Sequence, residues 1–220
     1  MRKDIVTSII GIIVLTLFLG VLYPLVITGV SQVAFPGNAN GQKIFRDGKL
    51  VGSKIIGQQF ATPVINSKTG KVKLDSDGNP VTKPDPRYFQ SRPSGTVPPY
   101  NAAATTFANL GPNSVLTKQA IVANIQAYLA LEKPYDPGLK ASNIPVDAAD
   151  TSASGIDPDI SPANADIQAH RIAAIRHLPM SQVMSLISTY THGRGLGFSG
   201  EPGVNVLQLN LALDRLQGSH

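Results

Sequence analysis

The sequence predicts a single N-terminal transmembrane helix followed by one α+β extracytoplasmic domain. The run from Ile5 to Gln42 contains no charged residue and is almost continuously apolar as far as Val30. A helix of about 20 apolar residues crosses the roughly 30 Å hydrocarbon core of a bilayer, so this run is long enough to span a membrane. The rest of the chain alternates short segments containing valine and isoleucine, glycine and proline turns, and stretches with a helical apolar period.

The apolar run is interpreted as a retained anchor and not as a cleaved signal peptide. Arg2 and Lys3 would suit the positive start of a signal peptide, but the apolar part of such a peptide is only about 7 to 15 residues long. No Ala-x-Ala pattern follows the run, and the chain has no cysteine that could carry a lipid anchor. We therefore expect a short cytoplasmic tail at 1–4, a transmembrane helix at 5–33 and an extracytoplasmic domain at 34–220.

The charges that flank the anchor do not decide its orientation. Arg2 and Lys3 precede it, whereas Lys43, Arg46 and Lys49 follow it closely. Long domains cross a membrane largely regardless of such charges, so we expect the N-terminus in the cytoplasm and the large domain outside.

Small residues divide the anchor into two packing faces. Thr7 and Gly11 share one helical face, and Thr16 and Gly20 share the opposite one. Small residues four apart allow two membrane helices to approach closely, although glycine is also common in membrane helices without such a role. Pro24 lacks an amide hydrogen and predicts a kink or a weakened helix near the outer end.

The chain after the anchor can be divided by its turn signals and apolar periods. The glycine- and asparagine-rich segment 35–41 predicts a turn, and 49–60 is typical of short strands, with turns at Asp47-Gly48 and Gly57. The polar segment 65–87 predicts an inserted loop or hairpin. Helices are predicted at 114–133, 161–177, 180–190 and 205–216, the second of them capped by Ser161. The leucine alternation in the last of these favours a strand, but the Asn205 cap and Gln208 at the third position favour a helix.

Composition and charge restrict the kinds of partner. The net charge is +5, but the basic residues are scattered along a chain with 20 glycines and 17 prolines, and no basic cluster with interleaved aromatic residues marks a nucleic-acid surface. Basic residues dominate 43–92, whereas 141–170 has aspartates and neither lysine nor arginine. If their carboxylates converge, four of these aspartates form a candidate cation-steering patch, and the alternative is a solvated surface with turn and cap aspartates. They are Asp147, Asp150, Asp157 and Asp159.

No motif predicts catalysis by this chain. It lacks the Gly-x-x-x-x-Gly-Lys-Ser/Thr loop that binds nucleotide phosphates and the Gly-x-Ser-x-Gly elbow of many hydrolases. Its four histidines do not form a ligand pair at metal-binding spacing. We therefore expect no catalytic residue, no metal site and no cofactor of its own.

A series of short motifs, in order along the chain, is more specific than any one of them. They are Tyr23-Pro24-Leu25-Val26-Ile27-Thr28-Gly29, Phe35-Pro36-Gly37-Asn38-Ala39-Asn40-Gly41, Gly57-Gln58-Gln59-Phe60, Tyr88-Phe89-Gln90-Ser91-Arg92-Pro93-Ser94, Asn109-Leu110-Gly111-Pro112-Asn113, Ser154-Gly155-Ile156-Asp157-Pro158, Gly195-Leu196-Gly197-Phe198 and Val204-Asn205-Val206-Leu207. Together they resemble the C subunit family of the Kdp potassium-transporting P-type ATPase over nearly the whole chain, apart from 65–87.

The resemblance implies a single-pass subunit of the bacterial inner membrane. Its partners would be a pump subunit, a channel-like potassium subunit and a small hydrophobic subunit, and the partners would handle ATP and potassium. A role of raising the pump subunit's ATP affinity has been proposed for the family, partly through a Ser-Gly-Gly-Ser-Asn stretch. That stretch reads Thr105-Thr106-Phe107-Ala108-Asn109 here, and losing both glycines removes the open backbone that a phosphate would need.

This chain departs from the family pattern at three further places. The pattern His-Ile-Ser-Pro reads Asp159-Ile160-Ser161-Pro162, the pattern His-Thr-Glu-Gly-Arg reads Tyr190-Thr191-His192-Gly193-Arg194, and Gly203 stands where arginine is common. A role of those family histidines therefore does not transfer.

Three functions follow from these observations. The leading hypothesis is an accessory, non-catalytic subunit that stabilises the potassium uptake complex and covers the outer entrance of the potassium-selective subunit. The second is a catalytic chaperone that raises the ATP affinity of the pump subunit. The third, from another class, is a stand-alone membrane-tethered binding or hydrolytic domain.

Overall fold

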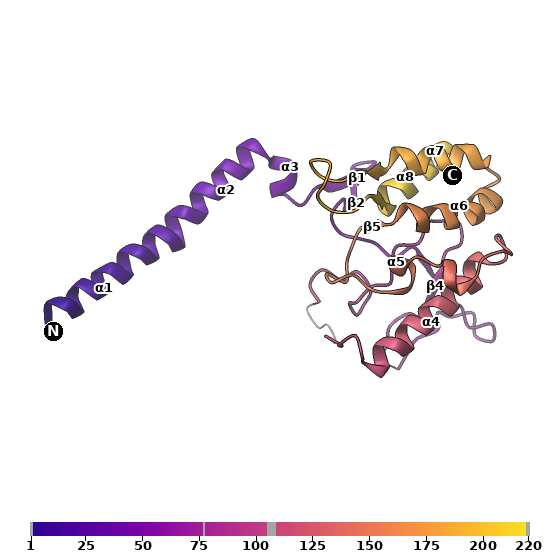
Figure 1. Ribbon diagram of the computed structural model, residues 1–220, viewed down its shortest axis with the longest axis horizontal. Helices are drawn as coiled ribbons and strands as arrows, with labels where there is room; N and C mark the ends of the chain where they lie inside the picture. The colour runs from indigo at the N-terminus through magenta and orange to yellow at the C-terminus, as the bar shows by residue number, and fades with distance from the viewer. Residues whose placement is uncertain (1, 77, 105–108, 219–220) are drawn as a thin grey trace. The chain divides into compact units, whose positions relative to one another are not determined.

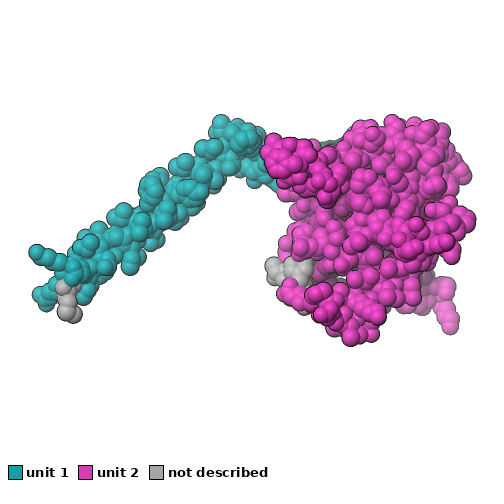
Figure 2. Space-filling model, in the orientation of Figure 1, with its two compact units in different colours: residues 1–53 teal, residues 54–220 magenta. Residues whose placement is uncertain are grey.

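The computed structural model describes residues 2–76, 78–104 and 109–218. The chain forms two compact units, Met1–Ser53 and Lys54–His220, shown in teal and magenta in Figure 2. The first unit contains the predicted anchor and the hairpin after it. The boundary between the compact units lies after Ser53, whereas the predicted transmembrane helix ends at position 33. The predicted limits of the tail, the transmembrane helix and the outer domain stay a prediction.

The first unit begins with one helical run, Arg2–Ala34, whose 33 residues are long and apolar enough to cross a membrane. It consists of α1 (Arg2–Leu17), a π-helical turn η1 (Phe18–Leu22) and α2 (Tyr23–Ala34) (Figure 1). In the π turn the Tyr23 N–H donates to the Phe18 carbonyl. The ring of Pro24 would clash with the carbonyl of Gly20, and the wider turn relieves this clash. The weakness predicted at Pro24 thus takes the form of a π turn just before it.

A short helix and a hairpin complete the first unit. The segment predicted as a turn, 35–41, forms the helix α3 (Pro36–Ala39) before it reverses. Strands β1 (Lys43–Arg46) and β2 (Lys49–Ser53) then pair antiparallel. Asp47 and Gly48 have φ values of 51° and 73°, as a two-residue hairpin turn with a right-handed twist requires. The predicted turn is confirmed here.

The second unit contains helices, a two-stranded sheet and a small three-stranded sheet. In chain order its elements are β3 (Ala61–Pro63), β4 (Thr82–Pro84), α4 (Val115–Glu132), η2 (Ala141–Asn143), α5 (Val146–Ala149), β5 (Asp159–Ile160), α6 (Pro162–Arg176), α7 (Met180–Thr189), β6 (Thr191–His192), β7 (Gly203–Asn205) and α8 (Val206–Leu216). Strands β3 and β4 pair antiparallel, and β7 lies between β5 and β6, antiparallel to both. Of the strands predicted in 49–60, only β2 forms, and the next strand begins at Ala61.

Side-chain caps explain where two of the predicted helices, α6 and α8, start. The Ser161 hydroxyl accepts from the Asn164 N–H at 3.1 Å, and the Asn205 side chain accepts from the Gln208 N–H at 3.1 Å. The last segment is therefore a helix after a short strand, as its cap predicted. Within 65–87, antiparallel bridges join Ile65 to Val72 and Leu74 to Pro80, and β4 pairs with β3 just before the segment.

The main core of the second unit lies among the three C-terminal helices and the central strand. Helices α6, α7 and α8 bury aliphatic side chains against β7, and Phe89 enters this core from an extended segment. The fully buried members are Phe89, Ala165, Ala169, Ile172, Val183, Val204, Val206, Leu209 and Leu213. A smaller cluster joins α4 to α5 and contains Tyr128, Leu139 and Ala148.

The extended segment around Phe89 is held by buried side chains in place of a neighbouring strand. Asn210 on α8 accepts from the Phe89 N–H and donates to its carbonyl, both at 2.9 Å. Gln168 on α6 does the same for Gln90, at 2.7 and 3.0 Å. Each amide therefore satisfies two backbone groups that burial would otherwise leave without partners.

Arg171 on α6 completes this arrangement. It is fully buried and donates to the carboxylate of Glu132 on α4 at 3.0 Å, to the Gln168 side chain at 2.9 Å and to the Tyr88 carbonyl at 2.9 Å, and it also contacts the Pro86 carbonyl. Burial raises the pKa of Glu132, and the charge and hydrogen bonds of Arg171 oppose that rise. One guanidinium thus joins two helices to the extended segment.

Arg171→Met is expected to destabilise the protein by about 3–5 kcal/mol, because it leaves a buried carboxylate and two carbonyls without their donor. Urea unfolding of the full chain in detergent micelles measures this loss. Adding Glu132→Leu should recover part of it, since no charge then stays buried alone. Arg215→Met removes an exposed arginine of α8 and should change stability by no more than about 0.5 kcal/mol. An Arg171→Met loss no larger than that of this control would contradict the central role of Arg171.

Candidate functional site

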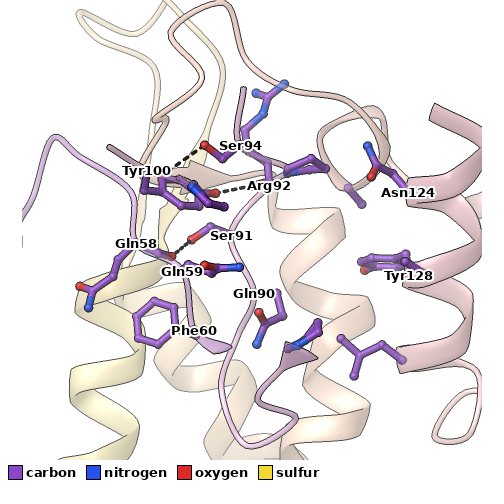
Figure 3. A pocket seen from close by; sticks show the side chains of 16 residues that line it. Gln58, Gln59, Phe60, Gln90, Ser91, Arg92, Ser94, Tyr100, Asn124 and Tyr128 are labelled. Carbon is purple, nitrogen blue, oxygen red and sulfur yellow. Dashed lines mark hydrogen bonds between the residues drawn. The ribbon is translucent and has the colours of Figure 1, made fainter. Parts of the chain in front are cut away.

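A cleft of about 370 Å³ lies in the second unit and is lined by segments far apart in the sequence (Figure 3). Its walls come from 58–60, 90–94, 99–100 and one face of α4. The lining side chains with polar groups are Gln58, Gln59, Gln90, Ser91, Arg92, Ser94, Tyr100, Asn124 and Tyr128. Two of these segments belong to motifs that had served only to identify the family resemblance.

Backbone contacts bring the first wall of the cleft close to the chain at 155–157. The Gly57 N–H donates to the Ile156 carbonyl at 2.8 Å, and Ser91 Oγ donates to the Gln58 carbonyl at 3.0 Å. A Cβ atom at Gly57 would lie less than 3.0 Å from the Asp157 carbonyl oxygen and the Tyr100 ring. Glycine at position 57 is therefore required by this close approach and not by its φ angle.

Arg92 fixes the loop on the far side of the cleft. Its guanidinium pairs with the Asp157 carboxylate at 3.2 Å and donates to the carbonyls of Asp150 and Thr151 at 3.3 and 2.9 Å. Its Nε atom is buried and has no hydrogen-bond partner among the described residues. Because Asp157 balances the Arg92 charge, the cleft has little net charge from this pair.

Ser94 and the two tyrosines supply hydrogen bonds and no activated nucleophile. Ser94 Oγ donates to the Gly155 carbonyl at 2.7 Å and accepts from the Tyr100 N–H at 2.9 Å. Burial raises the pKa of Tyr100 to about 12 and also raises that of Tyr128, so both phenols stay protonated at neutral pH. Tyr128 donates to the Asn164 side chain at 2.9 Å.

The cleft therefore offers the chemistry of a binding surface. Its amide side chains can donate and accept hydrogen bonds, and Phe60, Tyr100 and three prolines give it apolar area. Across residues 2–76, 78–104 and 109–218, no group of three or more histidine, cysteine, aspartate or glutamate side chains could hold a metal ion.

The four aspartates of the predicted cation-steering patch have local partners. Asp147 accepts from the Ser161 N–H and hydroxyl, both at 2.8 Å, and so holds the start of α6. Asp150 accepts from the Thr151 N–H at 2.8 Å, Asp157 pairs with Arg92, and Asp159 lies 3.0 Å from the His192 ring. Asp147 thus supports the capping residue Ser161 and is not itself a helix cap. Cation steering by the group stays a prediction.

The three departures from the family pattern meet on the small sheet. His192 on β6 and Asp159 on β5 flank Gly203 on β7, and their side chains lie 3.0 Å apart across it. A Cβ atom at Gly203 would lie 2.8 Å from His192 Nε2 and 3.2 Å from Asp159 Cβ. The family pattern that the chain resembles would place an imidazole at position 159 and a carboxylate at position 192. This chain has the two groups the other way round, and Gly203 leaves room between them.

The predicted packing residues of the anchor lie on an uncovered helix. Added Cβ atoms would meet nothing within 4 Å at Gly11, and only the Thr16 methyl group, at 3.9 Å, at Gly20. Thr16 and Gly20 are thus neighbours on the helix, and contacts of either face, Thr7 with Gly11 or Thr16 with Gly20, with another helix stay a prediction. Of the stretch likened to Ser-Gly-Gly-Ser-Asn, positions 105–108 lie outside the described residues.

Comparison with known proteins extends over nearly the whole chain. The family model described as KdpC: K+-transporting ATPase, c chain, matches residues 5–215. The chain is 43% identical over 211 residues to the potassium-transporting ATPase KdpC subunit of Methylococcus capsulatus, with 96% of each chain covered. It is 41% identical to the corresponding protein of Koribacter versatilis, covering 99% of this chain and 97% of the relative. For Mycobacterium bovis the identity is 40%, with 98% and 100% covered.

Asp159→Asn is expected to lower the pKa of His192, because the Asp159 carboxylate raises it by a hydrogen bond to the ring. A raised pKa means that the pair stabilises the folded chain below the ordinary histidine pKa of about 6.5 and loses this effect as pH rises through the folded value. An NMR titration of the imidazole in the full chain measures the shift. Asp166→Asn, at an exposed position of α6, is the control and should leave the titration unchanged. Equal His192 pKa values in the two variants would contradict the pair.

Proposed function

The chain belongs to the KdpC family, the c chain of the K+-transporting ATPase, and on this premise we propose that it is an accessory, non-catalytic subunit of a potassium uptake complex. Its partners would hydrolyse ATP and conduct potassium. The proposal places its single helix in the bacterial inner membrane, with the N-terminus in the cytoplasm and the large domain outside. The domain would cover the outer entrance of the potassium-selective subunit.

One observation carries the assembly part of this proposal. The family match at 5–215 includes nearly all of the helical run. None of the residues of α1, η1 and α2 is buried inside the chain. Lipid or the helices of partner subunits must therefore cover this whole surface. Thr16 and Gly20 leave room for a neighbouring backbone, which favours a partner helix on that face.

Gly20→Leu is expected to reduce assembly of the complex by roughly tenfold, because the new side chain fills the space that a partner helix would occupy. Copurification of the partner subunits with the tagged chain in mild detergent measures this loss. An added Cβ atom meets only an ordinary contact within the chain itself, so the variant should still fold and insert. Ile12→Leu, an apolar exchange of equal size on the same helix, should leave copurification intact. Unchanged copurification of Gly20→Leu would remove this face as a contact.

The acidic residues give a second test, which concerns potassium. If the domain covers the entrance, the field of its carboxylates would raise the local potassium concentration there. Asp147 holds Ser161, the cap of α6, and is left unchanged, since its loss would disturb the fold. The useful variant is Asp150→Asn with Asp157→Asn and Asp159→Asn, because asparagine keeps an oxygen for the local hydrogen bonds and loses the charge.

In the assembled complex this triple variant is expected to need about two- to tenfold more potassium for half-maximal ATPase activity, with little change in the maximal rate. High salt should shrink the difference, because salt screens exposed charges. The matched control, Asp47→Asn with Asp136→Asn and Glu201→Gln, removes three other acidic charges. An equal effect of both triple variants, or no effect of the first in an intact complex, would eliminate steering by this group.

A further inference from the structure

The hairpin that follows the helical run presents an apolar pair to solvent. Phe45 on β1 and Leu50 on β2 are direct cross-strand partners, so their side chains lie on the same face of the hairpin. They are 60% and 57% exposed, which is unusual for large apolar side chains placed opposite each other. Val33 and Phe35, at the end of α2, are 86% and 62% exposed in the same compact unit. These four residues give the end of the anchor an apolar surface that the described parts of the chain leave largely exposed.

Hydrogen bonds hold the hairpin to the end of the helical run. Ser53 at the end of β2 donates from its hydroxyl to the Gly41 carbonyl at 2.6 Å. Asn40 in turn donates to the Gln32 side chain at 3.0 Å and to the Pro36 carbonyl at 2.7 Å. Helix, short turn and hairpin are therefore one connected structure, and the hairpin cannot move far from the end of α2.

The length of the helical run brings this structure to the level of the lipid headgroups. The 33 residues of the run extend for about 50 Å at 1.5 Å per residue. A bilayer including its headgroups is about 40–45 Å thick, and a tilt in the usual range of membrane helices reconciles the two lengths. A helix that begins in one headgroup layer thus ends in the other, where the hairpin emerges.

The charge of the hairpin suits an anionic surface. Lys43, Arg46 and Lys49 lie on its strands, and the only acidic residue between Gln42 and Ser53 is Asp47, whose carboxylate is 3.9 Å from Arg46 Nε. Arg46 and Lys49 pair across the strands on the face opposite to Phe45 and Leu50, so their long side chains would bind phosphates at the edge of the inserted face. Apolar side chains combined with basic ones are typical of segments that bind the interface of membranes containing anionic lipids. A partner protein would need a matching acidic and apolar surface, which nothing in this chain indicates.

We propose that the β1–β2 hairpin is a membrane-surface foot, which inserts Phe45 and Leu50 among anionic lipid headgroups while its basic side chains bind their phosphates. Such a foot would restrain the chain where it leaves the bilayer. The inference rests on the helical run spanning a membrane, as in the proposed function, and it is independent of any role in potassium binding.

The test uses the absence of tryptophan from the chain. Phe45→Trp in the full-length chain makes one fluorescent reporter, reconstituted in vesicles of phosphatidylethanolamine with or without phosphatidylglycerol. With phosphatidylglycerol, the emission is expected to shift to shorter wavelength, to be quenched by brominated lipids and to be shielded from acrylamide in the water. Adding Lys43→Gln and Lys49→Gln should return the emission to longer wavelength.

Two control reporters separate the possible failures. Val14→Trp, within the helical run, should be quenched by brominated lipids in both kinds of vesicle, and its failure would instead overturn the membrane span. Ile65→Trp, 54% exposed on the other hairpin, should stay accessible to acrylamide. If Phe45→Trp is accessible to acrylamide in anionic vesicles while Val14→Trp is quenched by lipid, the membrane-surface foot is contradicted and the membrane span is not. Shielding that occurs only in the assembled complex, without quenching by brominated lipid, would also overturn it and indicate a partner protein.

Discussion

The second unit depends on one buried guanidinium. Arg171 neutralises the only carboxylate that the described chain buries on α4, and the same group holds the carbonyls of the extended segment 86–88. Neither charge would be tolerated alone in this environment, since an unpaired buried ion costs several kcal/mol. The position of α4 relative to α6 is therefore tied to the path of a segment that has no regular secondary structure.

The cleft follows from that path. Gln168 and Asn210 hold Gln90 and Phe89 by two hydrogen bonds each, so the next residues, Ser91 and Arg92, leave the core at a defined place. Arg92 then fixes the loop at 150–157 on the other side. The core and the cleft are thus parts of one hydrogen-bonded system.

The small sheet shows how the family fold accommodates a change in its charged residues. A carboxylate on β5 and an imidazole on β6 face each other across Gly203, at the two positions where the family pattern has them the other way round. Positions 159 and 192 are 33 residues apart in the chain, and the fold brings their side chains to 3.0 Å from each other beside Gly203. As separate motifs, each had suggested only that a histidine role was lost.

The sequence alone determined the features that depend on neighbouring residues. The apolar length of the anchor, the caps Ser161 and Asn205 and the turn at Asp47-Gly48 are all local, and each is present where it was predicted. The order of the motifs also identified the family. The π turn before Pro24 is also local, and the sequence predicted it only as a kink or a weakened helix. Only the tertiary structure decided the buried Arg171–Glu132 pair, the cleft and the partners of Asp147, Asp157 and Asp159. These rest on side chains that meet across long stretches of sequence, as Asn210 meets Phe89 across 121 positions, and no local period or propensity encodes such a meeting.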